Sequence, residues 1–208
     1  MAVLTSSQPQ LEQAHADGLS RAGGWLFRRR TAIPLPLALA VLLTPEQLAT
    51  GTAPMVATGV AAVAIGEGIR LWGVRHIGAI SRTRSDRLGP LVASGPFGVI
   101  RNPLYVGNIL LWIGFALSAR LVWLAPVFAA ILAFGYHAIV RWEERLLDER
   151  LGDRYHAYAA AVPRWVPKRF RAPSGAAAFT WQETLYSERG TLIAIAIGFA
   201  VLYLKHRA

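Results

Sequence analysis

Five apolar runs, separated by short turns or long polar loops, constrain the fold of this 208-residue chain more than any other feature. They cover residues 32–48, 53–74, 104–117, 121–140 and 191–204. A helix of roughly 17 to 25 apolar residues can cross a bilayer with its backbone polar groups satisfied internally. The sequence therefore predicts an all-α, polytopic transmembrane bundle of about five spans with a cytoplasmic cofactor-binding region. The last run is short, and the sequence leaves open whether it spans.

Composition and charge agree with this prediction. Charged residues make up 16% of the chain, against about 25% in soluble domains. The net charge of +10 would also suit a nucleic-acid binder. However, 18 of the 22 lysines and arginines lie before the first run or in the two long loops, residues 75–103 and 141–190. In contrast, the short turn between the third and fourth runs has only Arg120. This asymmetry places the N-terminus and both loops in the cytoplasm, at a bacterial inner membrane, and disfavours nucleic acid as a partner.

The pattern divides the chain into four regions. Residues 1–31 form a cytoplasmic N-terminal tail, residues 32–74 a transmembrane hairpin, and residues 171–208 an interfacial segment with the last hydrophobic helix. Residues 75–170 form the predicted catalytic core, with two spans and two long loops on one side, and long connections are often functional. The chain has no cysteine, so no disulfide or thiolate site is possible, and no metal site is predicted.

Two motifs stand out in the core. The first reads Ser94-Gly95-Pro96-Phe97, then Arg101-Asn102-Pro103-Leu104-Tyr105-Val106-Gly107. The second reads Glu143-Glu144, then Leu147, Leu151-Gly152, Tyr155, Tyr158, Val162-Pro163-Arg164 and Pro167. Taken alone, Asn102 and Pro103 suit the cap and first residue of a helix. Glu143 and Glu144, where a span leaves the membrane, are costly unless paired or solvated.

Together, in this order and spacing, the two motifs resemble the signatures of isoprenylcysteine carboxyl methyltransferases and related phospholipid methyltransferases, over roughly residues 85–167. The resemblance implies a membrane enzyme that transfers a methyl group from S-adenosylmethionine to a small or lipophilic acceptor: a carboxylate, phenol, thiol or amine. Its partners would be that acceptor and membrane lipid. Three alternatives stay open: a phospholipid N-methyltransferase, a membrane NADPH-dependent reductase of related architecture, and a non-catalytic membrane scaffold.

The resemblance also implies the residues of the site. The cofactor-binding residues would be Gly89, Pro90, Leu91, Val92, Phe97, Asn102, Pro103, Leu104, Tyr105 and Glu143. The candidate catalytic residues are Arg101, Tyr105, His137 and Glu144. Aromatic faces suit the adenine or the sulfonium cation, and a carboxylate accepts hydrogen bonds from ribose hydroxyls or the ammonium group. Packing inside the bundle is the alternative role of His137.

Three positions qualify this interpretation. Asn102 stands where the family usually has histidine, and asparagine cannot accept a proton near pH 7. Ile139 stands where prenylcysteine enzymes have an arginine that contacts the substrate carboxylate, which disfavours a prenylcysteine acceptor. Gly66-Glu67-Gly68 resembles the Gly-x-Gly with which phospholipid methyltransferases approach the cofactor, although close helix packing through small residues explains it equally well. Glu67 and Arg70 are spaced to form an ion pair.

Overall fold

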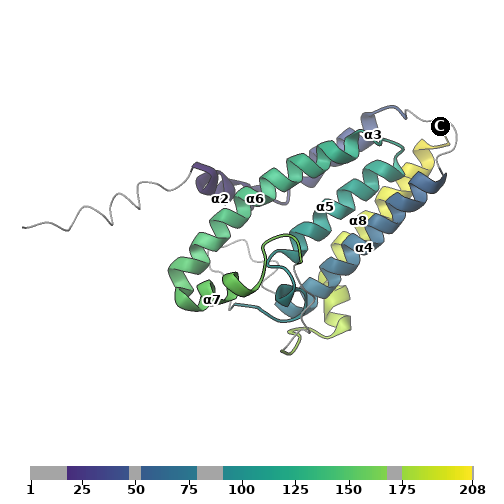
Figure 1. Cartoon of the computed structure of the whole chain (residues 1–208). Helices are drawn as coiled ribbons and strands as arrows, with labels where there is room; N and C mark the ends of the chain where they lie inside the picture. Colours follow the sequence, from purple (N-terminus) through teal and green to yellow (C-terminus); the bar gives the residue numbers. More distant parts are fainter. Residues whose placement is uncertain (1–17, 47–52, 79–90, 168–174, 208) are drawn as a thin grey trace, which may run out of the picture.

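The computed structural model describes residues 18–46, 53–78, 91–167 and 175–207. Within these ranges all regular structure is helical, which confirms the predicted all-α membrane bundle (Figure 1). The elements are α2 (Gly18–Arg29), α3 (Pro34–Leu43), α4 (Ala53–Ile77), the 3₁₀-helix η2 (Gly95–Gly98), α5 (Pro103–Ser118), α6 (Leu124–Leu151), α7 (Asp153–Ala161) and α8 (Trp181–Lys205).

Among the described helices, α4, α6 and α8 are long and apolar enough to cross a membrane. The apolar helices α3 and α5 are shorter, with 10 and 16 residues, so α5 covers roughly 24 Å at 1.5 Å per residue. A capping box between Thr180 and Glu183 starts α8 at Trp181. The run at 191–204 therefore belongs to a helix that is long and apolar enough to cross a membrane.

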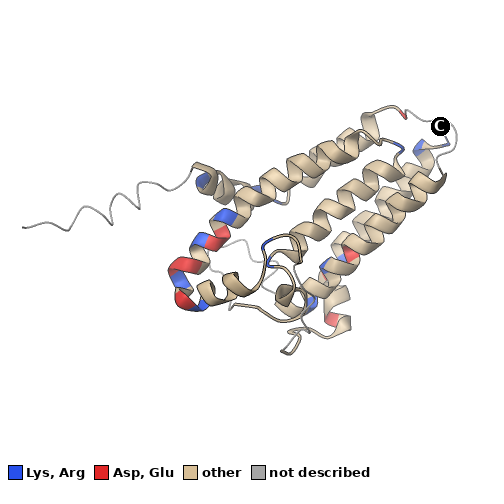
Figure 2. Ribbon diagram, in the orientation of Figure 1, with Lys and Arg blue, Asp and Glu red and all other residues tan. Residues whose placement is uncertain are grey.

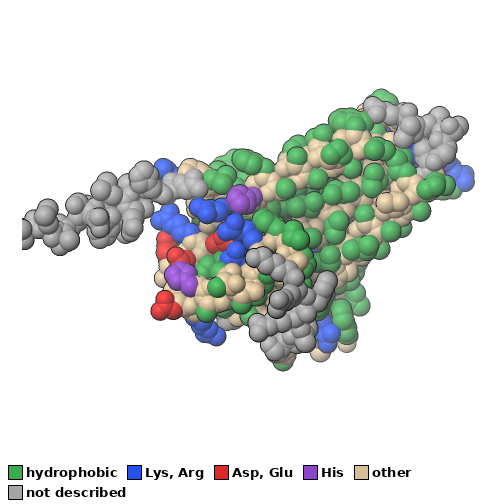
Figure 3. Space-filling view, viewed as in Figure 1, with side chains coloured by type: hydrophobic (Ala, Val, Ile, Leu, Met, Phe, Trp, Pro, Cys, Tyr) green, Lys and Arg blue, Asp and Glu red, His purple; other side chains and the backbone are tan. Residues whose placement is uncertain are grey.

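Many apolar side chains of the long helices point outwards from the bundle. Phe134 is 69% exposed and Ile131 is 56% exposed on α6, and Ile197 is 58% exposed on α8. Exposed apolar side chains of this number are typical of a surface that contacts a membrane or another protein. Figure 3 shows hydrophobic side chains along the flank of the bundle, while most charged side chains on this face gather at one end.

Glycines bring α4 and α5 into close contact. A Cβ atom on Gly66 would lie 2.7 Å from the carbonyl oxygen of Gly107, and one on Gly59 would lie 2.7 Å from that of Gly114. Gly59 and Gly66 of α4 therefore face Gly114 and Gly107 of α5. Small residues often form such close interfaces between membrane helices. In the Gly-x-Gly motif this packing explains Gly66, whereas a Cβ atom on Gly68 would have nothing within 4 Å.

The segment predicted as an N-terminal tail contains α2, which packs on α6. A Cβ atom on Gly23 would lie 1.9 Å from the carbonyl oxygen of Ala138, and one on Gly24 would lie 2.8 Å from Trp142 Nε1. Phe27 is 3% exposed, and its ring centroid lies 4.7 Å from that of Trp142. Residues 18–29 are therefore a docked helix, and the chain enters α3 from a fixed position beside α6.

The two ends of the bundle differ in charge (Figure 2). The C-terminal part of α6 and the helix α7 carry most of the charged side chains at one end. At the other end, Arg120 Nη1 donates to Glu46 Oε2 at 2.9 Å, and Lys205 Nζ donates to the carbonyl oxygen of Thr44 at 2.6 Å. These contacts fasten α8 and the α5–α6 turn to the end of α3. We call the end with α7 the charged end.

Candidate functional site

A cavity of about 1030 Å³ extends from the charged end of the bundle into its apolar half. Its walls form three zones. The motif zone, at the charged end, includes Leu91, Val92, Phe97, Arg101, Asn102, Pro103, Leu104, Tyr105, Glu143, Glu144, Tyr155 and Tyr158. The polar band consists of Arg70, Asn108, Tyr136, Glu188 and Thr191. The apolar channel includes Leu35, Ala38 and Leu42 of α3, Phe115 of α5, and Ile195, Gly198 and Leu202 of α8.

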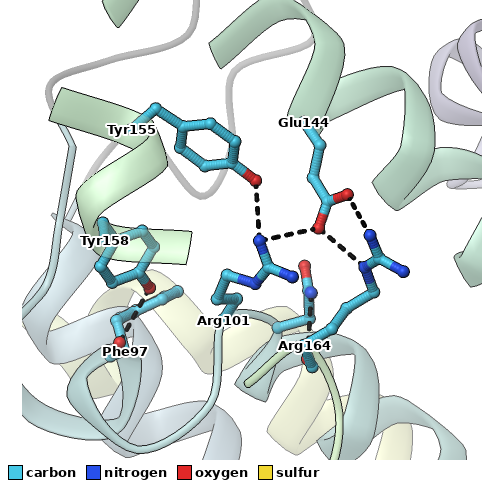
Figure 4. Close-up of polar contacts among 7 residues, drawn as sticks. Phe97, Arg101, Glu144, Tyr155, Tyr158 and Arg164 are labelled. Atoms are coloured by element: carbon cyan, nitrogen blue, oxygen red, sulfur yellow. Dashed lines mark hydrogen bonds and ion pairs between the residues drawn. The ribbon is translucent and has the colours of Figure 1, made fainter. Parts of the chain in front are cut away.

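The motif zone is closed by hydrogen bonds between the two sequence motifs. The backbone N–H of Arg101 donates to the carbonyl oxygen of Pro163 at 2.9 Å. The Asn102 Nδ2 group donates to the carbonyl oxygen of Arg164 at 3.1 Å. The Tyr158 hydroxyl donates to the carbonyl oxygen of Phe97 at 2.8 Å (Figure 4). Segments about 60 residues apart in the chain are thus fixed across one wall of the cavity.

Glu144 lies at the centre of an ion-pair network in this wall (Figure 4). Arg164 donates two hydrogen bonds to its carboxylate, from Nε at 2.8 Å and from Nη2 at 2.6 Å. Arg101 Nη1 lies 3.4 Å from Glu144 Oε1 and donates to the Tyr155 hydroxyl at 3.2 Å. Bidentate pairs of this kind are strong and directional. Glu144 therefore positions two arginines, and this pairing offsets the cost of placing a carboxylate here.

Burial keeps Tyr155 and Tyr158 of the motif zone neutral. Burial, with the negative charge of Glu144 as the next cause, raises the pKa of Tyr155 to about 12. Burial also raises the pKa of Tyr158. The hydrogen bonds to Glu144 raise the pKa of Arg164. Both phenols are therefore hydrogen-bond donors at physiological pH, and the Arg164 guanidinium keeps its charge.

Glu143 faces the cavity beside an aromatic pair. The Tyr105 hydroxyl donates to Glu143 Oε1 at 3.0 Å. The ring of Tyr105 stacks on that of Tyr136, with centroids 4.6 Å apart and an interplanar angle of 23°. Arg30, which follows α2, also lines the cavity and interacts electrostatically with Glu143. The position thus combines a carboxylate, aromatic rings and a cation at the inner end of the motif zone.

The structure brings most of the predicted site residues together. Leu91, Val92, Phe97, Arg101, Asn102, Pro103, Leu104, Tyr105, Glu143 and Glu144 all line the cavity. Gly89 and Pro90 lie outside the described residues. His137 lies on α6 but is not among the residues that line the cavity. The helix α5 starts at Pro103 as expected, but the Asn102 side chain makes no capping hydrogen bond. Its Nδ2 group instead donates to the carbonyl oxygen of Arg164.

Sequence reasoning missed two groups. The role of Arg164 was open to inference, because it belongs to the second motif, yet its pairing with Glu144 depends on how residues 162–167 fold back. Of the polar band, the sequence indicated only Arg70, as a partner of Glu67. A charge within an apolar run is a signal of function, which applies to Arg70 in α4, whereas Glu188 of α8 precedes the apolar run at 191–204.

Comparisons with known proteins agree with the motifs. The model of the phospholipid methyltransferase family matches residues 54–154. The cobalt-zinc-cadmium resistance protein CzcN of Cupriavidus metallidurans is 30% identical over 165 residues, which are 76% of this chain and 73% of that protein. The chain belongs to the isoprenylcysteine and phospholipid methyltransferase family.

A second relative of this chain is also named as a metal resistance protein. The nickel-cobalt-cadmium resistance protein NccN of Alcaligenes xylosoxydans xylosoxydans is 28% identical over 117 residues, 56% of this chain and 52% of that protein. No solved structure gave a significant match. The family match covers α4, α5 and α6 and ends at Arg154. Arg164 and the cavity-lining residues of α8 therefore lie beyond the matched residues.

Proposed function

We propose that this protein is an S-adenosylmethionine-dependent methyltransferase that acts on a lipophilic acceptor in the membrane. The observation that carries the proposal is one continuous cavity. Residues of both family motifs line its charged end, and the cavity continues into an apolar channel between α3 and α8. A polar cofactor and an apolar acceptor could therefore meet inside the bundle. Family members generally use S-adenosylmethionine.

The residues of the motif zone fit this cofactor. Glu143 offers a carboxylate for the ribose hydroxyls or the ammonium group, and Phe97 and Tyr105 offer aromatic faces for the adenine or the sulfonium cation. Arg101 Nε is buried and has no hydrogen-bond partner among the described residues. A buried donor without an acceptor is unfavourable, and the carboxylate of the cofactor is an acceptor of suitable charge. We assign these four residues to cofactor binding.

The protein contributes alignment and exclusion of water. S-adenosylmethionine supplies a methyl group that its sulfonium already activates for displacement. The hydrogen bonds of Asn102 and Tyr158 hold the wall of the motif zone in one shape, so that a bound cofactor and acceptor keep a fixed geometry. The apolar walls of the channel exclude water from the reacting groups. Arg101 and Glu144 act by positioning this wall, and Tyr105 orients Glu143 through its hydroxyl.

The acceptor would enter from the lipid. The channel is lined by Leu35 and Leu42 of α3 and by Ile195 and Ile197 of α8, and Leu35 and Ile197 are largely exposed on the flank of the bundle. An apolar acceptor can thus reach the cavity without crossing water. We place the charged end in the cytoplasm of a bacterial inner membrane because most basic residues lie there.

Calorimetry on the full chain in detergent tests this proposal. Wild-type protein should bind S-adenosylmethionine and S-adenosylhomocysteine. Glu143→Gln should weaken both at least tenfold, because a hydrogen bond to a charged group contributes about 1.5–3 kcal/mol. Glu149→Gln is the matched control, since Glu149 lies on the same helix with a side chain 56% exposed.

Two outcomes would contradict the proposal. Folded wild-type protein that binds neither sulfur compound is not an S-adenosylmethionine-dependent enzyme. A parallel titration with NADPH then decides between the two remaining classes, because binding indicates a reductase and no binding a scaffold.

A further inference from the structure

Arg30 reaches the cavity from the end of the N-terminal helix α2, which the family match does not include. The match begins at residue 54, whereas α2 precedes it in the chain and packs beside α6 (Figure 1). Phe27, Arg30 and Thr31 all line the cavity at this corner. The connection from α2 to α3 therefore adds a wall to the site that neither sequence motif supplies.

A stack of side chains fixes the guanidinium of Arg30. Its central carbon lies 4.1 Å from the centroid of the Phe27 ring, a distance at which the face of an aromatic ring attracts a cation. The Phe27 ring also packs against that of Trp142, with centroids 4.7 Å apart. The backbone N–H of Arg30 donates to the carbonyl oxygen of Phe27 at 3.3 Å. Through Phe27, Arg30 is thus tied to the residue that precedes Glu143 on α6.

The two adjacent carboxylates of α6 repel each other, and each is stabilised in a different way. Glu144 accepts two hydrogen bonds from Arg164. Glu143 accepts one hydrogen bond from the Tyr105 hydroxyl at 3.0 Å, and the charge of Arg30 attracts it. A tyrosine hydroxyl is uncharged, whereas a carboxylate at this depth is costly unless it is paired or solvated. Arg30 therefore supplies Glu143 with an opposite charge from α2.

We infer that Arg30 is a positioning residue of the cofactor site, which holds the Glu143 carboxylate ready to accept hydrogen bonds from the ribose hydroxyls or the ammonium group. The inference rests on the proposed function and adds to it a residue from outside the matched region. Because the docking of α2 on α6 sets the position of Arg30, α2 is then part of the cofactor site. Arg30 acts through Glu143 and needs no contact with the ligand.

A double-mutant cycle, measured by calorimetry on the full chain in detergent, tests this inference. Arg30→Gln should weaken S-adenosylmethionine and S-adenosylhomocysteine at least fivefold, because both carry the ribose and the amino-acid group that Glu143 would bind. In the Glu143→Gln background the same substitution should change either affinity less than twofold, since the effects of coupled residues are not additive. Arg30→Lys keeps the positive charge and should stay within threefold of the wild type.

Arg29→Gln is the matched control. Arg29 precedes Arg30 and also has its guanidinium over an aromatic ring, 4.4 Å from the centroid of Trp25. However, Trp25 is 51% exposed, and neither Arg29 nor Trp25 is among the residues that line the cavity. This control should change the affinity for either ligand less than twofold. If Arg30→Gln does not fold, as judged by gel filtration, Arg30→Met takes its place in the cycle, because it keeps an apolar stem over Phe27.

Two results would overturn the inference. Equal losses of affinity in the wild-type and Glu143→Gln backgrounds would show that Arg30 acts independently of Glu143. Unchanged affinity in Arg30→Gln, with or without a lower Tm, would show that Arg30 has no role in the cofactor site.

A failure of the proposed function has a different signature, because the wild type then binds neither sulfur ligand. The Tm values of the same four proteins without ligand still decide whether Arg30 holds Glu143. A fall in Tm caused by Arg30→Gln should disappear in the Glu143→Gln background, and an equal fall in both backgrounds would contradict the coupling.

Discussion

Replacing Gly66 by alanine tests how α4 and α5 pack, and Gly68→Ala in the same motif is its matched control. A Cβ atom on Gly66 would lie 2.7 Å from the carbonyl oxygen of Gly107 and 3.0 Å from the backbone nitrogen of Leu111. Both neighbours are backbone atoms, so they cannot move away as a flexible side chain could. The two helices must separate by several tenths of an ångström. A Cβ atom on Gly68 would meet nothing within 4 Å.

The two substitutions should change stability in opposite directions. Overpacking a well-packed interface costs about 1–3 kcal/mol, and alanine is favoured over glycine in a helix by about 1 kcal/mol. Gly66→Ala should therefore lose up to about 2 kcal/mol in net terms, whereas Gly68→Ala should gain up to about 1 kcal/mol. At roughly 2–4 °C per kcal/mol for a chain of this length, Gly66→Ala lowers Tm by up to about 8 °C.

Thermal unfolding in detergent, followed by tryptophan fluorescence and by gel filtration, measures both shifts. Equal Tm values for the two variants would refute the packing argument. A Gly66→Ala variant with unchanged Tm but much weaker binding of S-adenosylmethionine would show that this glycine makes room for the cofactor. The experiment thus separates the two interpretations of the Gly-x-Gly motif.

Three further predictions concern the charged end. Gly23→Leu should free α2 from α6 and speed tryptic cleavage after its exposed arginines at least tenfold, because cleavage requires local opening. Tyr158→Phe removes the hydrogen bond to Phe97, about 1 kcal/mol, and should weaken S-adenosylmethionine binding roughly fivefold by calorimetry. Tyr155→Phe should reduce the fall in Tm between pH 10 and 12, because the folded chain keeps the Tyr155 proton up to a pKa of about 12 and the unfolded chain releases it near 10.

Each of these predictions has a control of the same chemical type. Gly18→Leu is the control for α2, since a Cβ atom there would have nothing within 4 Å. Tyr186→Phe and Tyr203→Phe change exposed phenols on α8. Proteolysis that is equally fast in both glycine variants would contradict the docking of α2. The role given to Tyr158 is contradicted if the control substitutions weaken S-adenosylmethionine binding as much as Tyr158→Phe does. The role given to Tyr155 is contradicted if they change the fall in Tm between pH 10 and 12 as much as Tyr155→Phe does.

The apolar runs predicted the helices of the bundle because the membrane restricts the backbone so strongly. The run at 104–117 became α5 at Pro103–Ser118, since proline fixes the first turn. The end of α6 was less predictable. The apolar pattern stops near Arg141, but the helix continues to Leu151, where an ion pair between Arg145 and Glu149, four residues apart, supports it in water.

The motif zone could be predicted from the sequence because each motif is a continuous segment. The polar band could not, because Arg70 and Glu188 are separated by 118 residues. Their contact depends on how α4 and α8 are rotated about their axes, which hydrophobicity alone does not set. In the sequence, Arg70 reads as the partner of Glu67, and Glu188 reads as part of the polar segment before the last apolar run.

The cost of the polar band is itself an argument for a role in binding. A bundle that needed only stability would fill this volume with apolar side chains, since such a replacement of a buried ion pair is often neutral or stabilising. The packing of α4 on α5 is already provided by glycines, so Arg70 is not needed to join those two helices. The remaining consequence of Arg70 is that it holds Glu188 and Thr191 of α8 at the wall of the cavity, where the apolar channel meets the motif zone.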